Sequence, residues 1–155
     1  MGLAMDTIDR RILSELQDNA DLSMQELGDR VGLSHTPCWR RVKRLEERGI
    51  VKRRVALLDA EQLDLAVNVF VNVSLRRHQE NALNRFETAV QDVPEVVECY
   101  SVSGETDFLL RVVVADVTAY EHLVKATLVH LPEVGNLTST FALRQVKYTT
   151  ALPLP

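Results

Sequence analysis

The fold of the N-terminal part is decided by residues 23–54, which read SMQELGDRVGLSHTPCWRRVKRLEERGIVKRR. Ser23 and Glu26 have the spacing of a capping box, so they predict the start of a first helix. Ser34 is a good N-cap for a second helix, and Gly49 stands where a left-handed C-terminal cap is expected. The stretch therefore predicts a helix-turn-helix, followed by a basic wing on an extended segment.

The second of these helices has two different faces. At about 100° per residue, Cys38, Val42 and Leu45 share one narrow arc, which we expect to be buried. The opposite arc is polar and cationic with an aromatic side chain at its edge, which suits base and phosphate contacts in a major groove. The alternative is an ordinary solvated, charged face. The predicted DNA-binding residues are Ser34, His35, Thr36, Trp39, Arg40, Arg41, Lys43, Arg44, Arg53 and Arg54.

The charge distribution supports a DNA-binding N-terminal part, although the whole chain has a net charge of −4. Residues 1–54 contain eleven basic and nine acidic side chains, a net charge of +2, and the remainder of the chain has −6. Such an asymmetry is typical of a nucleic-acid-binding domain joined to a domain with another task.

The remainder of the chain predicts alternating strands and helices. Residues 66–75 alternate valine with other residues, which indicates a strand, and a Pro-Glu-Val tripeptide occurs twice, at 94 and at 132, after a predicted helix each time. The resulting order is βαββαβ, which predicts a ferredoxin-like sheet with both helices on one face. The other face would carry Phe70, so we expect it to pack against a second copy of the chain.

We therefore predict an α+β protein with three parts. A winged helix-turn-helix domain, which includes a further helix over residues 6–18, spans residues 1–55. A linker follows at 56–65, and a ferredoxin-like domain occupies 66–155. The sequence has no run of eighteen apolar residues and no secretory leader, so we expect a cytoplasmic, nucleoid-associated protein.

Three motifs resemble those of the Lrp/AsnC (leucine-responsive regulatory protein, or feast/famine) family. They are LSHTPCWRRVKRLEERGIV, VSGETDFLLRV and TSTFALRQVKYTTALPLP, and the resemblance covers essentially the whole chain. It implies a transcription regulator whose C-terminal domain, often called RAM, binds a small effector, usually an amino acid. It also implies dimers that assemble into tetramers or octamers.

The turn at residues 104–107 is the candidate effector site. Gly104 permits a positive φ, backbone N–H groups in such a turn can bind a carboxylate, and Asp107 can bind an ammonium group. From spacing alone, an ordinary hairpin turn is the alternative. The family resemblance implies an effector bound between subunits, with residues of the last strand from a second subunit. The predicted effector-binding residues are Tyr100, Val102, Gly104, Glu105, Thr106, Asp107, Thr138, Ser139 and Thr140.

Two other functions compete with this interpretation. An enzyme would have to use the four histidines, the two cysteines and the scattered carboxylates, but none of them forms a catalytic or metal-binding motif. We therefore expect no catalytic residue, no metal and no cofactor besides the effector. The other alternative is an architectural DNA-binding protein that responds to no effector. The identity of the effector, the operator, the direction of regulation and the role of Cys99 stay open.

Overall fold

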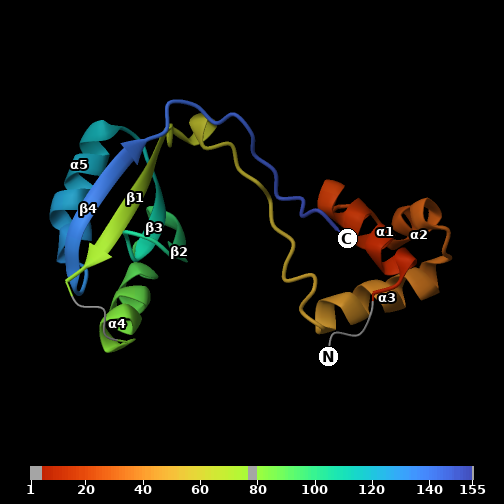
Figure 1. Ribbon diagram of the computed structural model, residues 1–155. Helices are drawn as coiled ribbons and strands as arrows, with labels where there is room; N and C mark the ends of the chain where they lie inside the picture. The colour runs from red at the N-terminus through yellow and green to blue at the C-terminus, as the bar shows by residue number, and fades with distance from the viewer. Residues whose placement is uncertain (1–4, 77–79, 155) are drawn as a thin grey trace. The chain divides into compact units, whose positions relative to one another are not determined.

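The computed structural model describes residues 5–76 and 80–154, and these divide into two units (Figure 1). The first unit, the head, combines Met1–Leu57 with Lys147–Pro155, and the second unit, the body, is Leu58–Val146. The chain therefore passes between the units twice. The predicted second domain spans residues 66–155, whereas this division groups the C-terminal tail, Lys147–Pro155, with the head.

The described residues of the head form three helices, α1 (Thr7–Asp18), α2 (Met24–Val31) and α3 (His35–Glu47). The predicted capping box is present, because Ser23 Oγ accepts from Glu26 N and the Glu26 carboxylate accepts from Ser23 N. The hydrogen bonds from Ser23 to this carboxylate lower the pKa of Glu26 below its ordinary value. The three helices share one core, made of Ile12, Leu13, Leu22, Leu27, Val31, Cys38, Val42 and Leu45.

Two glycines set the geometry of the turn between α2 and α3. Gly32 ends α2 in the left-handed conformation with φ 76°, which costs glycine little. Gly28 lies inside α2, and a Cβ atom there would stand 2.6 Å from the Leu33 carbonyl oxygen. Ser34 is the N-cap of α3, although its side chain makes no capping hydrogen bond. The turn is therefore held close to α2 by the absence of a side chain at Gly28.

The basic segment after α3 is extended, as the sequence predicts. Gly49 has φ 68° and ends the helical region, and residues 52–59 have no regular secondary structure. The predicted wing is thus a single extended segment in this structure, without a β-hairpin over these described residues. A short turn of 3-10 helix, η1 (Glu61–Leu63), follows, and the Asp59 carboxylate accepts from two of its backbone N–H groups.

The body has the predicted βαββαβ order. Its elements are β1 (Val67–Leu75), α4 (Glu80–Val90), β2 (Val96–Ser101), β3 (Phe108–Val114), α5 (Val117–Ala126), the 3-10 turn η2 (Leu128–His130) and β4 (Val134–Phe141). The strands pair antiparallel in the order β2-β3-β1-β4. Both helices pack on the same side of this sheet (Figure 1), where their apolar side chains join the inner valines of β1 in one core. The ferredoxin-like prediction is confirmed.

The other side of the sheet is uncovered in the single chain. Its surface, the outer face, follows from the strand register and consists of Asn68, Phe70, Asn72, Glu98, Tyr100, Leu109, Arg111, Val113, Thr138 and Thr140. Phe70 lies near its centre and is 38% exposed. A large aromatic side chain in that position has apolar surface that only a partner can remove from water.

Candidate DNA-binding face and effector site

The exposed side of α3 carries the residues that the sequence assigns to base contacts. Thr36, Arg40 and Lys43 are all exposed, while Cys38, Val42 and Leu45 are buried on the opposite side. Trp39 is 45% exposed, and the Lys43 ammonium lies 5.0 Å from the centroid of its ring. Lys43 Nζ also lies 3.8 Å from Glu47 Oε1. The face therefore combines a hydroxyl, two cations and an aromatic edge.

Two arginines of α3 are bonded to acidic groups at the start of α1, one of them at the N-cap, Asp6. Arg41 Nη1 donates to Asp6 Oδ2 at 2.6 Å and to Asp9 Oδ1 at 2.8 Å, and Arg44 Nη2 donates to both Asp9 carboxylate oxygens at 2.9–3.0 Å. The hydrogen bonds to Asp6 and Asp9 raise the pKa of Arg41. Arg41 and Arg44 thus fix the packing of α3 on α1.

The buried residue Asp9, whose carboxylate bonds both arginines, is a structural feature of the DNA-binding head that sequence reasoning missed. Its side chain is only 2% exposed, so its charge is balanced mainly by the two guanidinium groups. The sequence did contain a signal, because Asp9 falls three and four positions before Ile12 and Leu13, on the apolar side of the helix. An acid on a buried stripe needs a cationic partner from another element.

The remaining predicted DNA contacts are exposed and lie at both ends of α3. Ser34 and His35 are at its start, where backbone N–H groups are available to an anion. Arg53 follows its end on the extended segment, and Arg54 Nη2 pairs with Glu46 Oε1 at 3.0 Å. All of these groups are accessible to a phosphate backbone.

The turn between β2 and β3 is anchored to β1. Asp107 N donates to Val73 O at 2.9 Å, and Asp107 Oδ2 accepts from Leu75 N at 2.7 Å. Gly104 is exposed with φ 130°, and a Cβ atom there would meet no described atom within 4 Å. The backbone at Gly104 is therefore open to a ligand, while the Asp107 carboxylate has a structural hydrogen bond in addition to its predicted role.

The outer face brings the turn close to β4 within a single chain. Thr106 Oγ1 lies 3.5 Å from Asn72 Oδ1, and Asn72 is paired with Thr138 in the register of β1 and β4. Asn72 is thus a candidate site residue that was absent from the predicted set. An amide between two hydroxyl groups offers both donors and acceptors for a polar ligand.

The three predicted residues of the last strand do not share one face. Thr138 and Thr140 point to the outer face, whereas Ser139 points to the helices and its hydroxyl bonds the Tyr120 hydroxyl. Burial raises the pKa of Tyr120, and the Ser139 bond opposes this shift. Successive side chains of a β-strand point to opposite faces of the sheet, so Ser139 cannot share a face with Thr138 and Thr140.

Tyr100 and Val102 lie next to the turn, as expected. Tyr100 is 56% exposed on the outer face, and its hydroxyl donates to Glu98 Oε2 at 3.1 Å, which raises the pKa of the phenol. Val102 is half-buried, and its N–H donates to Asp107 O at 3.0 Å. Glu105 is exposed within the turn.

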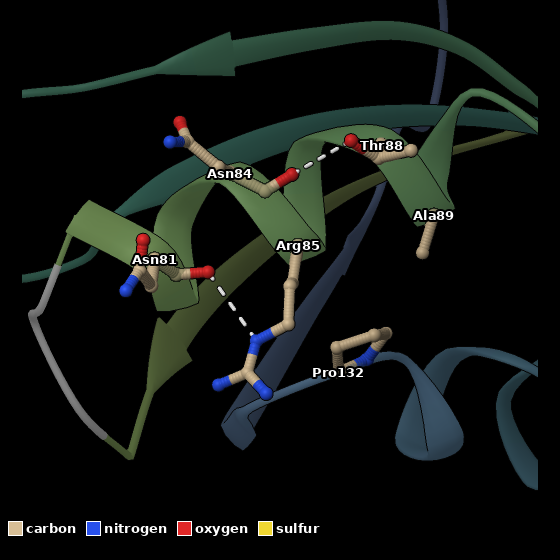
Figure 2. Close-up of a pocket in the computed structure, with 6 residues that line it drawn as sticks. All are labelled: Asn81, Asn84, Arg85, Thr88, Ala89 and Pro132. Atoms are coloured by element: carbon tan, nitrogen blue, oxygen red, sulfur yellow. Dashed lines mark hydrogen bonds between the residues drawn. The ribbon is translucent and has the colours of Figure 1, made fainter.

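A separate depression lies on α4 (Figure 2). It has a volume of about 700 Å³ and is lined by Asn81, Asn84, Arg85, Thr88, Ala89 and Pro132. The Arg85 guanidinium extends over it, donating to Asn81 O and pairing with Glu133 at 2.6 Å. None of the predicted effector residues lines this depression.

No cluster of His, Cys, Asp and Glu side chains in the described parts of the chain is arranged to hold a metal ion. Both cysteines are free thiols with raised pKa values, caused by burial in each case and also by the Glu87 charge at Cys99. A search of the described helices finds none that is long and apolar enough to span a membrane.

Two family models match the chain. A winged helix-turn-helix DNA-binding model covers residues 5–52, and the Lrp/AsnC ligand binding domain covers residues 68–152. The chain belongs to the Lrp/AsnC family. The resemblance found in the sequence motifs is thereby confirmed, and the protein is a transcription regulator with a DNA-binding head and a ligand-binding body.

Lrp/AsnC regulators are similar over nearly the whole chain. The DNA-binding transcriptional activator DecR of Escherichia coli is 43% identical over 150 residues, covering 97% of this chain and 99% of that protein. The leucine-responsive regulatory protein of Escherichia coli is 42% identical over 151 residues, covering 97% and 92%. These relatives are regulators of transcription, which confirms the expectation that the protein is not an enzyme.

Solved Lrp/AsnC structures have the same fold. An AsnC family transcriptional regulator from Agrobacterium tumefaciens aligns with a TM-score of 0.91 at 46% identity, covering 96% of this chain and 97% of that one. A transcriptional regulator from Neisseria meningitidis in complex with L-methionine aligns with a TM-score of 0.92 at 41% identity, covering 97% of both chains. The predicted α+β architecture is confirmed.

Proposed function

We propose that this regulator binds operator DNA sequence-specifically through α3 and that an amino acid bound by its body modulates this binding. The observation that carries the proposal is the open Gly104 backbone beside Asp107 and the Asn72–Thr138 pair. A free amino acid needs acceptors for its ammonium group and donors for its carboxylate, and this arrangement supplies both. The L-methionine complex of the Neisseria meningitidis relative supports this class of effector.

We further propose that the effector site is completed between subunits of a cytoplasmic homo-oligomer. Phe70 and its apolar neighbours on the outer face need a partner, and a second copy of the same face is the partner that a twofold dimer supplies. A ligand shifts an equilibrium only through different affinities for the two states. A site that joins subunits lets effector binding favour one assembly, and thus one spacing of the heads.

The test begins with a thermal-shift screen of the intact protein against the twenty amino acids. A ligand that binds only the folded state raises stability by roughly 2.7 kcal/mol at a hundredfold excess over its dissociation constant. Calorimetric titration of each hit then uses Asp107→Asn, which keeps an acceptor for Leu75 N but loses the charge, and Gly104→Val. We expect both variants to bind the effector at least tenfold more weakly and to bind DNA normally without it.

Substitutions in β4 provide a matched pair for the same titration. Thr138→Ala should weaken effector binding, because Thr138 lies on the outer face beside Asn72. Ser139→Ala should leave it unchanged and lower the stability of the body by about 1 kcal/mol, because it removes the hydrogen bond to Tyr120. An effector that binds all four variants as tightly as the wild type would place the site elsewhere.

A further inference from the structure

The C-terminal tail contacts the first helix of the head. The Gln17 side chain on α1 bonds both backbone groups of Leu152: Leu152 N donates to Gln17 Oε1 at 2.6 Å, and Gln17 Nε2 donates to Leu152 O at 3.2 Å. Leu154 packs against the core of the head and is half-buried. The Leu152 side chain itself is 71% exposed, so the backbone carries this contact.

The groove that the tail borders contains none of the predicted DNA-binding residues. The tail borders this shallow groove together with Arg11, Ser14 and Gln17 of α1. The exposed side of α3, with Arg40 and Lys43, is not part of this groove. The groove is therefore separate from the predicted DNA-binding residues.

The tail gives the head a second connection to the rest of the chain. The first connection is the segment 52–59, which has no regular secondary structure that would stiffen it. The second runs from β4 through residues 142–146 and ends at the docked tail. The two connections together close a loop of chain between the head and the body. Closing this loop reduces the conformational entropy of the head before DNA is bound.

We propose that the groove on α1 is a docking surface for the C-terminal tail, and that this second tether strengthens binding to operators with two half-sites. The inference rests on the proposed function, because it needs two heads that bind one operator. Binding of the second head is then an intramolecular step, and its effective concentration rises when the head is confined. Binding of one head to a single half-site gains nothing from the tether.

The test compares two duplexes and several variants. One duplex is selected by the wild-type protein from a random pool, and the other is the same duplex with one half-site scrambled. A chain that ends at Val146 should bind the full duplex about tenfold more weakly and the half-site duplex with unchanged affinity. Gln17→Ala and Leu154→Ala should shift the full-site affinity in the same direction, while Leu143→Ala, at a leucine that is 99% exposed, should not.

A second measurement reports docking without DNA. The Leu152 amide should exchange hydrogen at least tenfold more slowly in the wild type than in Gln17→Ala, because the variant lacks its acceptor. In the chain that ends at Val146, Gln17→Ala should have no further effect on DNA binding. Equal weakening on both duplexes, tighter binding after removal of the tail, or an unprotected Leu152 amide would overturn the inference. Equal wild-type affinity for the two duplexes, with a protected Leu152 amide, would instead contradict the proposed dimeric operator and leave the docking itself supported.

Discussion

Arg44 Nη2 lies 2.9 Å from Asp9 Oδ2, so a half-exposed cation at the edge of the recognition helix is paired with a buried carboxylate on α1. Arg41 reaches the same carboxylate from the preceding turn of α3. The position of α3 in the head therefore depends on electrostatic contacts with Asp9 as well as on apolar packing.

We predict that Asp9→Ala destabilises the head by about 2 kcal/mol, because both guanidinium groups lose a charged hydrogen-bond partner. The cost stays moderate, since Arg44 is 51% exposed and water replaces part of the lost interaction. Urea unfolding followed by the fluorescence of Trp39, the single tryptophan of the chain, reports on the head. Asp21→Ala, at an exposed acid in the same unit, is the control and should change stability by less than about 0.5 kcal/mol.

The head should lose stability in acid. Backbone hydrogen bonding from Asp9 and the bond from Arg41 lower the pKa of Asp6 below its ordinary value. A carboxyl group with a lowered folded-state pKa contributes stability above its unfolded pKa, and this contribution disappears as the pH falls below about 4. Asp6 is the N-cap of α1, and its side chain accepts from Asp9 N at 2.8 Å. Asp6→Asn keeps this acceptor but does not titrate in the same range, so the unfolding midpoint of the variant should fall less between pH 5 and pH 3 than that of the wild type. A parallel decrease in both proteins would contradict this role.

Arg40 and Arg54 should affect DNA binding in different ways. Arg40→Ala removes a contact from the exposed side of α3 and should reduce discrimination at one or two operator positions by about 1 to 3 kcal/mol. Arg54→Ala should weaken binding to all sequences alike and reduce the salt dependence by about one unit. Competition assays with single-position operator variants, repeated over a range of salt, separate the two. Equal and sequence-independent losses would rule out the assignment.

Much of this architecture could be predicted from the sequence. Capping at Ser23 and the period-two valines of β1 are local signals, and they identify elements without knowledge of their neighbours. The pairing of Arg41 with Asp9 could not be found in this way, because a helical wheel orders residues around one helix and says nothing of what an adjacent helix contributes. The docked tail could not be predicted for the same reason. Its hydrogen bonds to α1 are made by the backbone of one residue, Leu152, which produces no repeating pattern in the sequence.

One group of predicted site residues does not share a face of the sheet, and the sequence contains a signal for this. Thr138, Ser139 and Thr140 were grouped because the family resemblance implied the last strand as a whole. The alternation of a strand already requires Ser139 to face away from its neighbours. The structure adds the reason for its position, which is the hydrogen bond to Tyr120.

Self-association should depend on Phe70. We predict that Phe70→Asp in the full chain shifts the protein toward monomer, because it places a charge on the face that the second copy would cover. Val117→Asp, at a valine that is 59% exposed at the start of α5, should leave the assembly unchanged. Size-exclusion chromatography with light scattering at micromolar concentration measures both. A wild-type protein that is already monomeric would contradict the proposed assembly.

The position of Arg111 has a consequence for any such partner. Arg111 stands opposite Phe70 in the strand register, and its Nε lies 3.1 Å from Glu98 Oε1 without hydrogen-bond geometry. A surface that covers Phe70 must therefore remove water from this ion pair. A purely apolar surface would offer no hydrogen bonds to offset the free-energy cost of that desolvation. The outer face therefore favours a partner surface that can hydrogen-bond Arg111 and Glu98. The amides of Asn68 and Asn72 on an identical face are such groups.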